Sequence, residues 1–207
     1  MDIPVARPRE SYHVGNLAPR LLAAARSLLE RGGAANLSLR ALSKEVGVSA
    51  TASYHHFSTR HELLSHLAAE GFTELRSALA RVIAQAGRAP LLDSACLAYL
   101  EFARCNPALY QLMFGPDLAG EDAIPKLRTA REDAFTALKA IITVVLGPDA
   151  KDTDAQRAAV ACWSYTHGLA SLWLHGVLHT RSNPTSEQLV RRTLPAFAQL
   201  IEAARRD

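Results

Sequence analysis

Apolar residues recur three and four positions apart along most of the chain, which is the spacing of one helix face. The first such run begins after Asn16, a favoured N-cap residue, and ends at Gly32 and Gly33. Its apolar face consists of Leu17, Leu21, Leu28 and Leu29. The pattern predicts a first helix of about four turns.

Two short helices are predicted next, joined by a turn that contains a glycine. Ser38 is the expected cap of the first, and Gly47 ends it. Ser49 opens the second, over residues 50–57. The apolar positions of the first are Leu39, Leu42 and Val46. This arrangement is typical of a helix-turn-helix.

The rest of the chain also has a helical pattern. Thr59 and Glu62 form a capping box for a longer helix that extends to about Gln85, and residues 87–90 break it. Five further helices are predicted over residues 91–105, 107–114, 123–146, 153–179 and 186–205, with Pro195 expected to kink or interrupt the last. β-Branched residues in 140–146 favour a strand locally, but no partner strand is evident. The predicted fold class is therefore all-α, with about nine helices.

Composition indicates a soluble, compact protein: the 207 residues are 49% apolar and 21% charged, with a net charge of +3. Disordered and fibrous classes are excluded, and neither a signal peptide nor a membrane span is expected. Cys96, Cys105 and Cys162 are odd in number and lie outside any CxxC spacing. They are expected to be free thiols in a reducing compartment, which places the protein in the cytoplasm.

The excess positive charge lies in the first third of the chain. Residues 1–66 hold eight Lys or Arg and five Asp or Glu, whereas the remainder balances to zero. A local excess of this size can also arise by chance, so the helix-turn-helix is the more specific indication of a DNA surface. Small residues at the start of the second short helix would let it approach base edges, while its later Tyr and His suit phosphates. The candidate DNA-binding residues are Ser38, Arg40, Ser49, Ala50, Thr51, Tyr54, His55 and Arg60. Alternatively, Ser38 and Thr59 only cap helices, and Tyr54 and Phe57 only fill a small core.

Several motifs fall in the same order as in a known family: Tyr12-His13-Val14-Gly15-Asn16-Leu17, Leu37-Ser38-Leu39-Arg40, Gly47-Val48-Ser49, Tyr54-His55-His56-Phe57 and Leu63-Leu64. Residues 12–66 thus resemble the DNA-binding domain of the TetR family of transcriptional regulators. The resemblance implies a three-helix domain whose third helix enters the major groove. It implies phosphate contacts by Ser38, Tyr54, His55 and Arg60, and places Arg40, Ala50 and Thr51 nearest the bases. Ser43 and Ser53 depart from the usual pattern, where Ala and an apolar residue are common.

Residues 67–207 resemble, more sparsely, the WHG-type C-terminal ligand-binding and dimerisation domain of one branch of the family. The motifs are Phe102-Ala103-Arg104, Asn106-Pro107-Ala108-Leu109-Tyr110, Met113-Phe114, Trp163 and His167-Gly168. The resemblance implies a cavity for a small, mostly apolar effector, and a four-helix bundle with a second subunit. Candidate ligand residues are Phe102, Tyr110, Met113, Phe114, Trp163 and His167, which could equally be core aromatics.

A helix-packing seam with a three-four-three spacing runs through Trp163, Thr166, Ala170, Trp173 and Val177. Candidate dimer residues are Ala170, Trp173, Val177, Leu189, Phe197 and Ile201, and the alternative is packing within the chain. His167, His175 and His179 share one helix side, but no carboxylate or cysteine joins them at ligand spacing. We therefore expect no metal, no cofactor and no catalytic residues.

The sequence therefore predicts a homodimeric, sequence-specific DNA-binding repressor whose affinity for a palindromic operator falls when a small effector binds. An activator, or a regulator that answers to a protein partner, remains an alternative of the same fold. An all-α enzyme with a site assembled from distant residues is the alternative from another class. Residues 1–11 are expected to form a flexible N-terminal arm, either a solvated tail or an arm in the minor groove.

Overall fold

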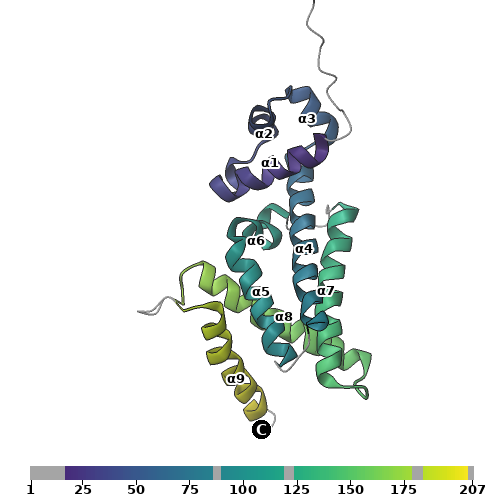
Figure 1. Cartoon of the computed structure of the whole chain (residues 1–207), viewed down its shortest axis with the longest axis vertical. Helices are drawn as coiled ribbons and strands as arrows, with labels where there is room; N and C mark the ends of the chain where they lie inside the picture. The colour runs from purple at the N-terminus through teal and green to yellow at the C-terminus, as the bar shows by residue number, and fades with distance from the viewer. Residues whose placement is uncertain (1–16, 86–89, 119–123, 179–183, 205–207) are drawn as a thin grey trace, which may run out of the picture. The chain divides into compact units, whose positions relative to one another are not determined.

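The structure, a computed structural model, describes residues 17–85, 90–118, 124–178 and 184–204, and no side chain beyond residue 199. Within these ranges all regular structure is helical (Figure 1). The nine α-helices are α1 (Leu17–Gly32), α2 (Leu39–Val46), α3 (Ala50–His56), α4 (Arg60–Ala84), α5 (Leu91–Cys105), α6 (Pro107–Phe114), α7 (Pro125–Leu146), α8 (Asp152–Leu174) and α9 (Ser186–Ala204). Two short 3₁₀ turns, η2 (Ala34–Asn36) and η3 (Pro116–Leu118), complete them. The all-α prediction is confirmed; the N-terminal arm and Asn16 lie outside the described residues.

The chain divides into two compact units, Met1–Arg60 (unit 1) and His61–Asp207 (unit 2). This division falls six residues before the expected boundary after His66. The reason is that α4 is continuous from Arg60, so most of it is counted with the helices that follow it.

Unit 1 contains the helix-turn-helix that the capping residues predict. The Ser38 and Ser49 hydroxyls accept hydrogen bonds from the amides of Ala41 and Ala52, at 3.1 and 3.2 Å. Gly47 ends α2 with φ 73°, a left-handed conformation that costs little without a Cβ. α2 packs against both α1 and α3. The buried core is Leu21, Ala25, Leu29, Leu37, Leu39, Leu42 and Phe57.

The two positions that depart from the family pattern face each other. Ser43 on α2 and Ser53 on α3 are buried, and their hydroxyl oxygens lie 2.7 Å apart. Ser43 Oγ also lies 2.7 Å from the Leu39 carbonyl oxygen. A serine has one hydroxyl proton, so when Ser43 donates to the carbonyl, Ser53 donates to Ser43. A polar pair therefore joins α2 to α3 where an apolar contact is usual.

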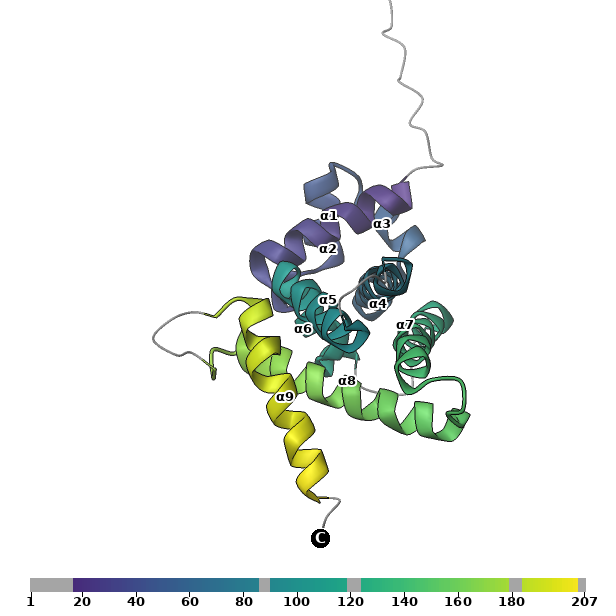
Figure 2. The ribbon, with the colours of Figure 1, turned by 60° about the horizontal axis from the view of Figure 1, so that its bottom comes forward.

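Unit 2 is built around α5, which packs against α6, α7, α8 and α9. Figure 2 shows α5 against the middle of α8, with α7 on one side and α9 on the other. α6 approaches α4 closely at Gly71, where a Cβ would lie 2.5 Å from Met113 Sδ. None of the described helices is both long and apolar enough to cross a membrane.

The end of α8 and the course of α9 differ from the sequence predictions. α8 ends at Leu174 rather than at residue 179, because Gly176 adopts φ 74° and Val177 N donates to the Leu172 carbonyl. Those bonds form a Schellman stop that the apolar spacing does not reveal. α9 continues through Pro195 without interruption, so the interruption considered from the sequence is not seen.

Candidate functional site: a DNA-facing surface and an aromatic cavity

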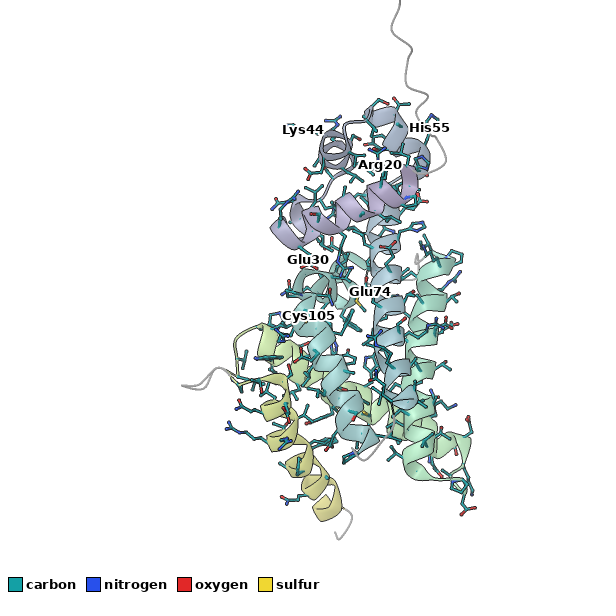
Figure 3. All side chains as sticks on the ribbon, viewed as in Figure 1. Arg20, Glu30, Lys44, His55, Glu74 and Cys105 are labelled. Atoms are coloured by element: carbon teal, nitrogen blue, oxygen red, sulfur yellow. The ribbon has the colours of Figure 1, made fainter. Side chains whose placement is uncertain are left out.

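In unit 1, the candidate DNA-binding residues on α2 and α3 and at their N-caps are exposed to solvent. They are Ser38, Arg40, Ser49, Ala50, Thr51, Tyr54 and His55. Tyr54 keeps 48% of its surface exposed although it is a large aromatic residue. Figure 3 shows Lys44 on α2 and His55 on α3 at the surface of this unit. These side chains are available to a partner, so filling a small core does not account for Tyr54.

Unit 1 has a positive net charge over its described residues because basic residues outnumber acidic ones, and both of its described carboxylates are in ion pairs. Residues 17–60 contain two acidic residues, Glu30 and Glu45. Glu30 pairs with Arg26 at 3.4 Å, and Glu45 pairs with Arg31 at 2.7 Å. The sequence of α3 contains no carboxylate, and α2 carries the cations Arg40 and Lys44 beside the paired Glu45.

Arg60 has a different environment from the other candidates. Its Nε donates to the Leu37 carbonyl at 2.9 Å, and its terminal nitrogen donates to the Ala34 carbonyl at 2.7 Å. These bonds join the start of α4 to the segment before α2. A phosphate contact by Arg60 stays a prediction, but its guanidinium also has this structural role.

In unit 2, an aromatic cavity of about 400 Å³ lies among α4, α6, α7 and α8. Its lining consists of Phe72, Met113, Phe114, Gly115, Leu118, Arg131, Phe135 and Trp163. The rings of Phe72 and Phe114 meet edge to face with centroids 5.3 Å apart, and those of Phe135 and Trp163 lie 5.8 Å apart. The volume falls in the range of small-molecule sites.

Three polar aromatic residues form a hydrogen-bonded group, and two of them pack against the Phe114 ring. The Tyr110 hydroxyl lies 2.7 Å from His167 Nδ1, and the Tyr99 hydroxyl lies 3.3 Å from both groups. Burial raises the pKa of Tyr110 to about 12 and lowers the pKa of His167. These shifts favour the neutral form of both groups, so a neutral hydroxyl and a neutral imidazole share this hydrogen bond. The rings of Tyr110 and His167 both pack on Phe114, with centroid distances of 4.9 and 4.5 Å.

Residues 21–67 match the family model described as "Bacterial regulatory proteins, tetR family", and residues 92–197 match the one described as "Tetracyclin repressor-like, C-terminal domain". The second match alone covers more than half of the 207 residues. The chain belongs to the TetR family. The resemblance predicted for both halves of the sequence is thereby confirmed.

Known proteins similar to this TetR-family chain agree. A solved protein of unknown function from Rhodococcus sp. RHA1 is 32% identical, with a TM-score of 0.76 over 91% of this chain and 97% of that one. PfmR, a TetR family transcriptional regulator from Thermus thermophilus, shares the fold, with a TM-score of 0.57 at 18% identity over 84% of this chain and 94% of its own. The HTH-type transcriptional regulator Rv1816 of Mycobacterium tuberculosis is 34% identical over 109 residues. That match spans 51% of this chain and 45% of the relative, so it covers under half the length of the curated relatives.

Within this TetR-family protein, the structure divides the candidate ligand residues into three groups. Met113, Phe114 and Trp163 line the aromatic cavity. Tyr110 and His167 stand behind Phe114, and Phe102 lines a separate, open cavity of about 730 Å³ beside α4 and α5. Glu74 and Cys105, labelled in Figure 3, also line that second cavity.

The cavity residues Phe72, Arg131 and Phe135 are not among those predicted from the sequence. A signal for Arg131 was present, because it occupies a position in the apolar stripe of α7. That stripe runs through Leu127, Ala134 and Leu138, all of which are buried. A charge at such a position indicates either a buried pair or a ligand contact.

The candidate dimer residues lie in unlike environments. Ala170 and Leu189 are already buried within the chain, and Val177 is 66% exposed but follows the end of α8. Trp173 is half-buried, and the Phe197 ring stacks on Tyr165 at 4.7 Å. The side chain of Ile201 and the whole of His179 lie outside the described residues. The first part of the predicted seam thus packs within the chain, since Thr166 is buried as well.

Proposed function

We propose that this TetR-family protein is a homodimeric repressor of the cytoplasm that binds a palindromic DNA operator through α3 and is released by a small, mostly apolar effector. One observation carries the proposal: Thr51 and Tyr54 are exposed on a capped helix in a unit whose described carboxylates are all paired. Thr51 can contact a thymine methyl or an acceptor, and the Tyr54 hydroxyl suits a phosphate oxygen. We assign the protein no enzymatic activity.

Release would follow from a change in the spacing of two reading helices. A dimer places its two recognition helices in successive major grooves only when they are about 34 Å apart. α4 begins at Arg60, the last residue of unit 1, and carries Phe72 of the cavity. An effector that favours another position of α4 would therefore weaken operator binding, by an amount equal to its differential affinity for the two arrangements.

The test is selection of bound sequences from random duplex DNA near physiological salt. Wild type is compared with a Thr51→Ala, Tyr54→Ala double variant and with a matched Thr136→Ala, Gln156→Ala variant, which changes two exposed residues of unit 2. We expect a palindromic consensus for wild type and the control, and its loss in the α3 variant. Affinity for the consensus should fall steeply with salt. Enrichment that survives the α3 substitutions would overturn the assignment of α3.

A further inference from the structure

The aromatic cavity contains one charged side chain among its described lining residues, Arg131. Its guanidinium carbon lies 5.7 Å from the centroid of the Phe72 ring, over the ring face. Its terminal nitrogen lies 3.4 Å from the Leu118 carbonyl, a long hydrogen bond. A guanidinium has five N–H donors, and the described residues use few of those of Arg131.

No carboxylate of the described residues neutralises this charge. The acidic residue on the same helix that makes an ion pair, Asp133, lies 4.0 Å from Arg76 instead. Burial lowers the pKa of Arg131, and no neighbouring acid opposes that effect among the described residues. A partly desolvated cation without a counter-charge is costly, and an anion supplied by a ligand would remove that cost.

The other polar groups near the cavity are already engaged. Tyr110 and His167 satisfy each other behind Phe114, and the remaining walls are aromatic or aliphatic. Among the described lining residues, the cavity thus combines one cation, Arg131, with aromatic and aliphatic side chains. Arg binds planar carboxylates through two parallel hydrogen bonds, which is the strongest neutralising geometry available to it.

We propose that the effector is a small organic acid, with its carboxylate on Arg131 and an aromatic or aliphatic body against Phe72, Phe114 and Trp163. This inference rests on the proposed ligand role of the cavity and names the class of ligand. The volume of about 400 Å³ limits the body to a small one.

The experiment is calorimetric titration of the whole protein, without DNA, with benzoate, 3-phenylpropanoate, 4-phenylbutanoate and octanoate. Each acid is paired with its neutral primary amide, which has a similar shape but no charge. We expect at least one acid to bind about tenfold or more tightly than its amide, as a charge-assisted hydrogen bond predicts. If no acid binds, or if amides bind as well as acids, the proposal is wrong.

Variants of Arg131 test whether this side chain causes the preference for acids over amides. Arg131→Gln should bind the acid no better than the amide. Arg131→Lys keeps the positive charge but cannot form two parallel hydrogen bonds with a carboxylate, so it should keep part of the preference for the acid. Arg128→Gln is the matched control, because Arg128 is exposed on the same helix one turn earlier and its loss changes the net charge equally. Thermal unfolding of each variant verifies that it folds. An acid preference that survives Arg131→Gln, or that Arg128→Gln also removes, would exclude Arg131 as the acceptor of the carboxylate.

A second assay separates this inference from the proposed function. The acid that binds through Arg131 is added to the protein on its selected operator. Release supports both proposals. Binding of the acid without release leaves the ligand class standing and overturns effector-controlled repression.

Discussion

The two units of this TetR-family protein differ in how the sequence brings their candidate functional residues together. In unit 1 the candidate groups come from one short segment, residues 38–60, and most of them lie on the surface. In unit 2 the side chains that line the aromatic cavity come from four helices, from Phe72 on α4 to Trp163 on α8. A contiguous surface is encoded by local spacing and caps, whereas a cavity depends on how distant helices pack. The two can therefore be disturbed separately.

The largest expected effect is from Leu42→Ala, which removes a fully buried side chain from the small core of unit 1. The truncation should cost about 2–5 kcal/mol of stability. Amide hydrogen exchange in α1–α3 should accelerate and operator binding should be lost. Fluorescence should change little, because Trp163 and Trp173 both lie in unit 2. An equal disturbance of both units would refute their independence.

A smaller effect on the stability of unit 1 is expected from substitutions in the Ser43–Ser53 pair. Ser43→Ala leaves the Ser53 hydroxyl buried without its partner, at a cost of about 1–3 kcal/mol. The double variant Ser43→Ala, Ser53→Ala removes both polar groups and should recover most of that loss. A double-mutant cycle of urea unfolding, followed by circular dichroism, measures the coupling. Additive losses would mean that the hydroxyls do not act as a pair.

Helix ends in unit 1 could be predicted from the sequence, whereas contacts between residues on different helices could not. Ser38, Gly47 and Ser49 mark helix ends by local chemistry, so the helix-turn-helix was predictable within a residue or two. The pairing of Ser43 with Ser53 was not, because each looks like a packing defect until α2 and α3 are placed together. The position of Arg131 in the apolar stripe of α7 was visible, but its contacts with Phe72 and Leu118 were not, because both are distant in sequence. The end of α8 was missed because apolar spacing continues beyond Gly176 although the backbone turns there.

The smallest expected effect is a pH dependence of the stability of unit 2. Burial lowers the pKa of His167, so the unfolded chain binds a proton at a higher pH than the folded one. Stability should therefore fall as pH drops below the unfolded value of about 6.5. The groups facing this imidazole, Tyr99, Tyr110 and Ser171, are neutral and do not compensate its charge.

Urea unfolding followed by tryptophan fluorescence between pH 5 and pH 7.5 measures this effect. His167→Gln should flatten the dependence, while the exposed His175→Gln should leave it as in wild type. Part of the slope should remain in His167→Gln, because burial and the nearby Lys126 also lower the pKa of His66. Identical slopes in wild type and His167→Gln would contradict a neutral, buried His167. They would also remove the argument that Tyr110 and His167 satisfy each other, which is what leaves Arg131 as the polar contact of the cavity.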